Sequence, residues 1–99
     1  MKLIISWEAA ADLDRLCSFL EKCNPAAAER AATTIESAIE SLDTMPERGR
    51  RSKLHKAREL VVPFGQSSYV VRYRYSIEND EIIVLRIWHG RESRDRAPK

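Results

Sequence analysis

Arginines alternate with other residues in the C-terminal half of the sequence, and they are the first candidates for a binding surface. Arg72 and Arg74 stand two positions apart, as do Arg86 and Trp88. Residues two positions apart on an extended strand point to the same face of a sheet. Guanidinium groups beside an indole are typical of protein-binding hot spots. We therefore expect these four residues to form a partner-binding surface. The alternative interpretation is an ordinary polar face on which Trp88 lies over an arginine.

The middle of the chain carries a second candidate, a strongly cationic segment. Residues 48–58 hold six cationic side chains and no acidic one. The net charge of +2 hides an asymmetry: residues 1–47 have four basic and nine acidic side chains, whereas residues 48–99 have thirteen basic and six acidic. Such a segment is either a solvated loop or a contact surface for an acidic partner. The asymmetry favours an acidic peptide or a polyanion, with Arg58 among the contacting residues, and leaves direct nucleic-acid binding open.

Groups for metal or nucleophilic chemistry are sparse. On one helix, Cys17 and Cys23 would lie about 9 Å apart along the axis and on diverging faces, which is poor geometry for a disulfide. The two histidines, His55 and His89, do not cluster with the cysteines in a metal-ligand spacing. We therefore predict no metal, no cofactor, and free thiols in a reducing cytoplasm. His89 is expected to make local hydrogen bonds at a strand end.

Hydrophobic periodicity predicts six elements. Ser6 is a plausible cap for the first helix, and Asn24 followed by Pro25 is typical of the start of another. The predicted helices begin at Trp7 and Pro25, and the predicted strands are 3–5, 59–62, 69–75 and 81–88. The order β-α-α-β-β-β predicts an α+β fold, an antiparallel-rich mixed sheet with a helical hairpin packed on one face.

Alternation along the last two strands predicts which side chains meet the helices. On the last strand the inward set is Ile83, Leu85 and Ile87, and the outward set is Val84, Arg86 and Trp88. On the preceding strand the inward set is Val71, Tyr73 and Tyr75, and the outward set is Val70, Arg72 and Arg74. The helix-free face of the sheet would then gather three arginines and a tryptophan.

Length and composition limit the class of protein. We expect the 99 residues to form one domain, 1–99, because two separate cores would each be too small. Hydrophobic residues at 43% and charged residues at 32% are typical of a globular domain with a highly charged exterior. No apolar run approaches the ~20 residues of a membrane span, and the first residues are too short for a signal peptide. A polar tail begins at about residue 92.

Short motifs occur along nearly the whole chain in a familiar order. They are Ile5-Ser6-Trp7, Asn24-Pro25-Ala26, Met45-Pro46-Glu47-Arg48-Gly49-Arg50, Arg58-Glu59-Leu60-Val61, Tyr69-Val70-Val71-Arg72-Tyr73-Arg74, and Val84-Leu85-Arg86-Ile87-Trp88-His89-Gly90-Arg91. Together they resemble the RelE/ParE superfamily of small toxins from bacterial type II toxin–antitoxin modules. The Trp88-His89-Gly90-Arg91 ending looks closest to the ParE-like branch, which is associated with plasmid stabilisation.

The resemblance implies a compact toxin that a cognate antitoxin binds and silences. ParE-like toxins are similar to inhibitors that act on DNA gyrase through protein contacts and so block replication. From composition we expect an acidic antitoxin segment to cross the arginine and tryptophan surface, and to extend a sheet edge.

Two alternatives remain open. The first is a RelE-like, ribosome-dependent mRNA endonuclease that uses His89, Arg91, Lys53 and Lys56. RNA cleavage needs a base, an acid and cations for the phosphate. The segment 62–65, where RelE-type enzymes present an arginine, has no cation, and no tyrosine or histidine follows Gly90. The second alternative is a toxin fold without activity that serves as a binding protein.

Overall fold

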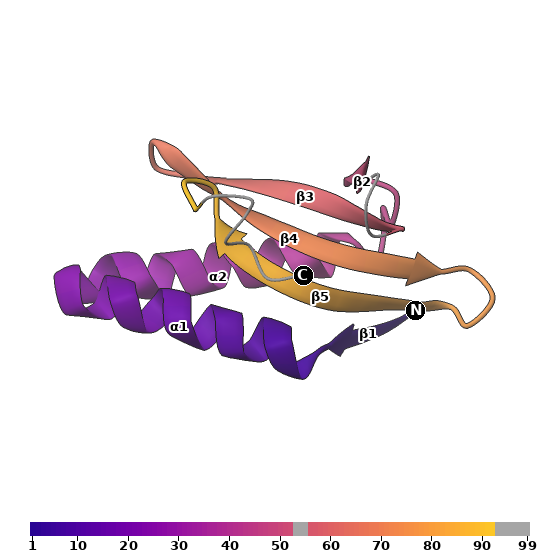
Figure 1. Ribbon diagram of the computed structural model, residues 1–99, viewed down its shortest axis with the longest axis horizontal. Coiled ribbons are helices and arrows are strands. Elements are labelled where there is room, and N and C mark those ends of the chain that lie inside the picture. The colour runs from indigo at the N-terminus through magenta and orange to yellow at the C-terminus, as the bar shows by residue number, and fades with distance from the viewer. Residues whose placement is uncertain (53–55, 93–99) are drawn as a thin grey trace.

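The two helices begin and end where polar side chains can cap them. A computed structural model describes residues 1–52 and 56–92, with α1 at Trp7–Cys23 and α2 at Pro25–Ser41. Ser6 Oγ accepts from the Ala9 N–H at 3.1 Å, and Asn24 Oδ1 accepts from the Ala27 N–H at 3.2 Å. The Asn24 N–H also donates to the Leu20 carbonyl at 2.6 Å, which closes α1. The predicted antiparallel helical hairpin is confirmed (Figure 1).

The strands form one mixed sheet in the order β1-β5-β4-β3-β2. Their bounds are β1 Lys2–Ile5, β2 Arg50–Ser52, β3 Ala57–Phe64, β4 Ser67–Ser76 and β5 Glu81–His89. β1 runs parallel to β5, and the other neighbours are antiparallel. The predicted α+β class and the antiparallel-rich mixed sheet are therefore confirmed. The prediction missed β2, because a three-residue strand in a cationic segment has no apolar alternation to reveal it.

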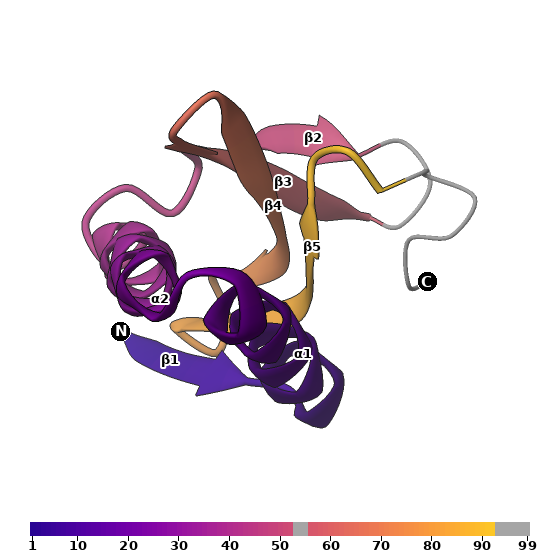
Figure 2. The same cartoon turned by 90° about the vertical axis from the view of Figure 1, so that its left-hand side faces the viewer.

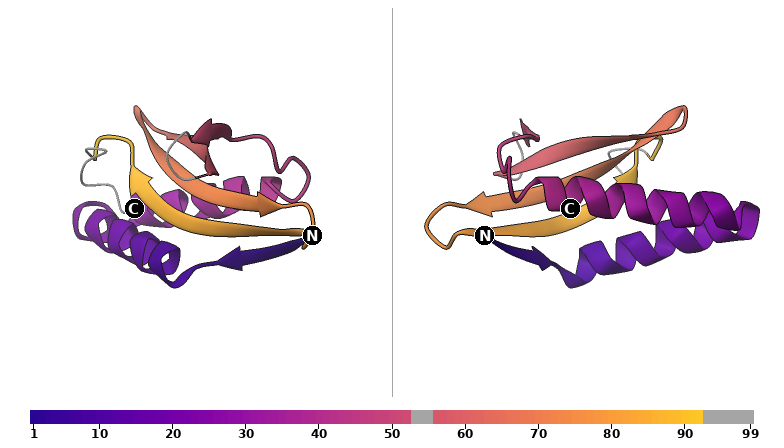
Figure 3. Two further views of the ribbon diagram at one scale, coloured as in Figure 1. Left: turned by 45° about the vertical axis from the view of Figure 1, so that its right-hand side comes forward. Right: turned by 180° about the vertical axis from the view of Figure 1, so that it is seen from behind.

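Both helices cover one face of the sheet, and the core lies between the two layers (Figure 2). Ala31, Ile35 and Ile39 of α2 are buried there, together with Val71 and Tyr73 of β4. The small Ala9 and Ala31 side chains allow the helix backbones to approach the sheet and each other closely. No helix among the described residues is both long and apolar enough to cross a membrane. No helix formed by residues 1–52 or 56–92 lies on the opposite face of the sheet (Figure 3).

A β-bulge in β5 changes which residues face the core. Arg72 lies opposite Arg86, but the next residue of β4, Tyr73, lies opposite Val84, so Leu85 is the extra residue. A bulge breaks the simple alternation of side chains along a strand. The inward residues of β5 are therefore Ile82, Val84 and Ile87. The prediction of Ile83 and Leu85 as inward residues and of Val84 as outward was wrong, because Val84 is fully buried and the other two are only half-buried.

Candidate functional site

Arg72 and Trp88 lie together on the helix-free face of the sheet, as predicted. The Arg72 guanidinium carbon is 4.8 Å from the centroid of the Trp88 ring. Arg72 Nη2 also donates to Glu59 Oε2 at 3.1 Å, across the β3–β4 pair. Arg72 is 7% exposed and Trp88 is 4% exposed. This cluster is therefore a packed, internally paired part of the protein, and the expectation of an open indole on this face is corrected.

Arg86 does not join that surface; it turns to α1. Its Nε donates to Asp12 Oδ2 at 2.9 Å and its Nη2 donates to Asp12 Oδ1 at 3.0 Å, a two-point pair between guanidinium and carboxylate. The Ile87 N–H donates to the same Asp12 Oδ2 at 2.9 Å. The reason is the length of the strands: β1 pairs with β5 only as far as Val84, so beyond that point α1 takes the place of a strand neighbour. The prediction that Arg86 shares a surface with Trp88 and Arg72 was wrong.

Arg74 and Arg58 occupy two further environments. Arg74 is exposed on β4, opposite Ile83 of β5. Arg58 Nη1 donates to the Gly49 carbonyl at 2.9 Å and to the Glu47 carbonyl at 3.3 Å, so it anchors the segment between α2 and β2. The five residues predicted to bind a partner are thus distributed over four different settings.

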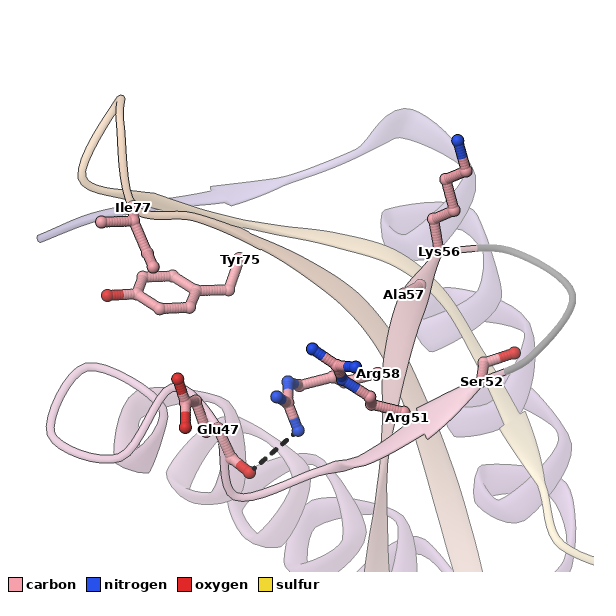
Figure 4. Close-up of a pocket in the computed structure, with 8 residues that line it drawn as sticks. All are labelled: Glu47, Arg51, Ser52, Lys56, Ala57, Arg58, Tyr75 and Ile77. Carbon is pink, nitrogen blue, oxygen red and sulfur yellow. Dashed lines mark hydrogen bonds between the residues drawn. The ribbon is translucent and has the colours of Figure 1, made fainter.

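A cationic cavity of about 410 Å³, here called the basic pocket, lies beside Arg58. It is lined by Glu47, Arg51, Ser52, Lys56, Ala57, Arg58, Tyr75 and Ile77. Arg51 lies opposite Arg58 in the β2–β3 pair, and both guanidinium groups reach toward Glu47, whereas the Lys56 side chain extends away from them (Figure 4). The pocket can attract anions, and none of the residues that the structure describes in its lining is a histidine.

A larger cavity of about 780 Å³, here called the aromatic groove, lies between α1 and the C-terminal end of β5. Its apolar lining is Leu16, Phe19, Leu20, Phe64 and Tyr69, and its polar lining is Asp12, Arg15, Arg86, His89, Arg91 and Glu92. Phe19 is 68% exposed although it is aromatic. An exposed aromatic side chain in an apolar groove with a charged rim is typical of a protein-docking surface.

The polar groups of the aromatic groove are engaged with one another. His89 Nδ1 accepts from the Arg91 N–H at 3.1 Å, and the His89 ring meets the edge of Tyr69 with the centroids 5.3 Å apart. Burial raises the pKa of the Tyr69 phenol, so Tyr69 stays protonated at neutral pH. Arg15 Nη1 lies 2.6 Å from Glu92 Oε1, and this hydrogen bond raises the pKa of Arg15. Ion pairs therefore engage four side chains of the groove, Asp12, Arg15, Arg86 and Glu92, and His89 makes the local hydrogen bond that was predicted for it.

The structure separates the residues proposed for RNA cleavage. His89 and Arg91 line the aromatic groove, Lys56 lines the basic pocket, and Lys53 lies outside the described residues. His89 pairs with Tyr69, which pairs with Val62. Lys56 precedes Val62 by six positions, about 20 Å along a strand at ~3.3 Å per residue. Lys56 and His89 thus belong to opposite ends of the sheet.

Asp12 is the residue of this region that the sequence analysis missed. A signal was present, because Asp12 stands three positions after Ala9 and four before Leu16, both buried on the core side of α1. An acid in the apolar stripe of a helix indicates a buried polar contact.

Comparison with known proteins gives one family for the whole arrangement. Residues 3–94 match the family described as the ParE toxin of the type II toxin–antitoxin system parDE. The chain is 42% identical over 92 residues to Toxin RelE1 of Caulobacter vibrioides, covering 93% of this chain and 96% of that one. It is 40% identical over 86 residues to Toxin RelE3 of the same organism, covering 87% and 90% of the two chains. The chain belongs to the ParE toxin family.

Solved structures agree with this assignment of the toxin. One chain of the chromosomal ParDE toxin–antitoxin system from P. aeruginosa superposes with a TM-score of 0.74 at 27% identity, covering 90% of this toxin and 95% of that chain. A chain of the RelBE2 complex from Mycobacterium tuberculosis has the same fold, with a TM-score of 0.59 at 22% identity over 89% of this toxin and 95% of that chain. The protein is therefore a type II toxin of the RelE/ParE superfamily, and its relatives carry both RelE and ParE names.

Proposed function

We propose that this toxin inhibits growth by protein contact, with DNA gyrase as its target, and that a cognate antitoxin neutralises it. Plasmid stabilisation is the role that this proposal implies. The single observation that supports it most strongly is the separation of the residues that an RNA-cleaving centre would need. Lys56 lies in the basic pocket, whereas His89 and Arg91 lie in the aromatic groove.

Apart from His89, the groups that line the aromatic groove are poorly suited to general acid–base catalysis. A base must be free to take a proton at neutral pH. The Tyr69 phenol has a raised pKa, and the carboxylates of Asp12 and Glu92 are paired with arginines. The strand end at 62–64 supplies Val62, Pro63 and Phe64, with no cation for a phosphate. These features favour an inhibitor over an endonuclease.

The two target classes are separated by two parallel assays. Purified toxin is added to gyrase and relaxed plasmid, and separately to a translation reaction whose message is analysed by primer extension. We expect supercoiling to be inhibited while the message stays intact. Message cut at codon-spaced positions, with the cuts lost in His89→Ala, would overturn the proposal in favour of the endonuclease. Toxin that neither inhibits gyrase nor cuts message would indicate an inactive binding protein.

The aromatic groove is the surface that we propose for the antitoxin. Its exposed Phe19 offers an apolar anchor, and the exposed Arg91 at the rim suits an acidic segment. Phe19→Ser should weaken binding of the antitoxin at least tenfold in titration calorimetry. Ile77→Ser is the matched control, because Ile77 is also an exposed large apolar residue, at 74%, but lies at the basic pocket. Equal affinity of both variants would remove the groove from the proposal.

A further inference from the structure

β1 forms one edge of the sheet, and no strand of the described residues pairs with its outer side. The strand order ends at β1, and neither Figure 1 nor Figure 2 shows another labelled element beyond it. The Lys2 N–H donates to the Asp80 carbonyl at 2.9 Å and the Ser6 N–H to the Val84 carbonyl at 3.0 Å. Successive residues of a strand direct their N–H and C=O groups to opposite sides. Leu3 and Ile5 therefore direct theirs outward, away from β5, as a template for pairing.

The side chains of this edge are apolar and accessible. Leu3 is 37% exposed, Ile5 is 43% exposed, and Trp7, at the start of α1, is 91% exposed. Leu3 pairs with Ile82 and Ile5 pairs with Val84, so both stand on the helix-covered face at its margin. Exposed edges are usually protected by charged residues, proline or bulges. Among the strand residues only Lys2 is charged, so the edge is poorly protected.

The sequence of this edge is complementary to itself in one antiparallel register. With Ile4 opposite Ile4 of a second copy, Leu3 lies opposite Ile5, and Lys2 lies opposite Ser6. Leu3 and Ile5 both direct their backbone groups outward, so each such pair can exchange two hydrogen bonds. The same register keeps the two Lys2 side chains apart and directs Met1 toward the start of α1, where the exposed Trp7 lies. Leu3 and Ile5, the two exposed apolar residues of β1, thereby each gain an apolar partner on the second copy.

We propose that two copies of this toxin associate through β1, forming one continuous sheet with two-fold symmetry. A second copy fits better than an unrelated strand because the edge is complementary to itself. In such an isologous contact the same residues of both copies form the interface. Three residues in the paired core of each strand make a small contact, with Trp7 adding aromatic area at either end. Interfaces below about 1,200 Å² are typical of weak association. The dimer accordingly forms at micromolar concentration.

Sedimentation equilibrium on the 99-residue chain, with no residues added before Met1, tests the association. We expect the apparent mass to rise from monomer to dimer as the concentration rises through the micromolar range. Ile5→Lys should raise the dissociation constant at least tenfold because it places two cations in the interface. Val61→Lys is the matched control, since Val61 is 41% exposed on β3. A wild-type chain that stays monomeric at 200 µM would overturn the proposal. Binding of an antitoxin strand to this edge would not rescue the proposed dimer.

A cross-link tests the register, independently of whether Ile5→Lys folds well. In a chain with Cys17 and Cys23 replaced by serine, Ile4→Cys should oxidise rapidly to a disulfide-linked dimer. Ile4 would form a non-hydrogen-bonded pair with itself, with Cα atoms about 4.5 Å apart, within reach of a disulfide bond. Lys2→Cys in the same background should cross-link at least tenfold more slowly, because Lys2 faces Ser6. Equal rates for the two variants would refute the register and with it the proposed dimer.

Discussion

Replacing Asp12 with alanine should destabilise this toxin more than any surface substitution on α1. Asp12 is 3% exposed, and its carboxylate accepts three hydrogen bonds, two from Arg86 and one from the Ile87 N–H. The alanine variant would leave a guanidinium without its partner and a buried backbone N–H without an acceptor. Both losses are costly in a poorly solvated site.

The expected loss in the free energy of unfolding is about 3 kcal/mol. Removing one partner of a buried ion pair costs about 3–5 kcal/mol, and the lower end applies because the Arg86 side chain is 22% exposed and gains some water. For a domain of this size, each kcal/mol lowers the melting temperature by about 4–8 °C. The Asp12→Ala variant should therefore melt about 12–24 °C below the parent protein.

Chemical denaturation followed by far-UV circular dichroism measures this loss. Asp14→Ala is the matched control on the same helix; Asp14 is exposed, so its loss should change the free energy of unfolding by less than about 0.5 kcal/mol. Asp12→Leu combined with Arg86→Met removes both charges and should recover at least about 1 kcal/mol relative to Asp12→Leu alone. An Asp12→Ala variant within about 0.5 kcal/mol of the parent would refute the argument that this carboxylate holds α1 to β5.

Four further predictions concern buried groups outside that pair. Tyr73→Phe removes the hydroxyl that donates to the Pro46 carbonyl at 2.7 Å and accepts the Gly49 N–H at 2.8 Å, and it should cost about 1–3 kcal/mol in denaturant titrations. Burial raises the pKa of the Tyr73 and Tyr69 phenols above 10, so the folded state holds more protons than the unfolded state at alkaline pH. The free energy of unfolding should fall as the pH rises above 10, and less steeply in Tyr73→Phe; an equal slope would contradict this assignment. Gly49→Ala would place a Cβ 2.7 Å from Tyr73 Cε1 and 3.0 Å from the Glu59 carbonyl oxygen. We therefore expect the free energy of unfolding, measured by thermal unfolding, to fall by about 1–3 kcal/mol. Gly65→Ala is the control, because its Cβ would meet no atom within 4 Å and the only strain comes from the positive φ of 59°. Arg72→Ala leaves Glu59 without its ion pair and Trp88 without the guanidinium over its ring. We expect a red shift in Trp88 fluorescence and a fall of about 2 kcal/mol in the free energy of unfolding. An unchanged spectrum would count against the packed cluster.

The fold was predictable because its signals are local. The Ser6 and Asn24 caps, Pro25 and the apolar spacing of the helices each act within a few residues, and they place both helices correctly. Period-two runs also place β4 and β5, whereas β3 extends two residues beyond the predicted 59–62 at each end, because Pro63 and Phe64 still pair with β4. β2 was missed since its three residues are stabilised by pairing with β3 alone.

The candidate surfaces were less predictable, because they depend on contacts between distant residues. Alternation can place Arg72 and Trp88 on one face, but it cannot tell that Glu59 pairs with Arg72 and that the indole is buried. The aromatic groove combines Phe19 of α1 with His89 at the far end of the chain. No short motif contains both, so sequence spacing gave no reason to group them.

By itself the sequence determined the unequal distribution of charge and, for every element except β2, the type and the order, since these follow from composition and backbone propensity. Only the tertiary structure decided the directions of the β5 side chains, because the bulge at Leu85 arises from pairing with β4. It also decided the partner of Arg86, a carboxylate 74 positions away on α1. Burying a guanidinium requires a nearby anion, and which anion is near depends on how the chain packs, which local sequence does not encode.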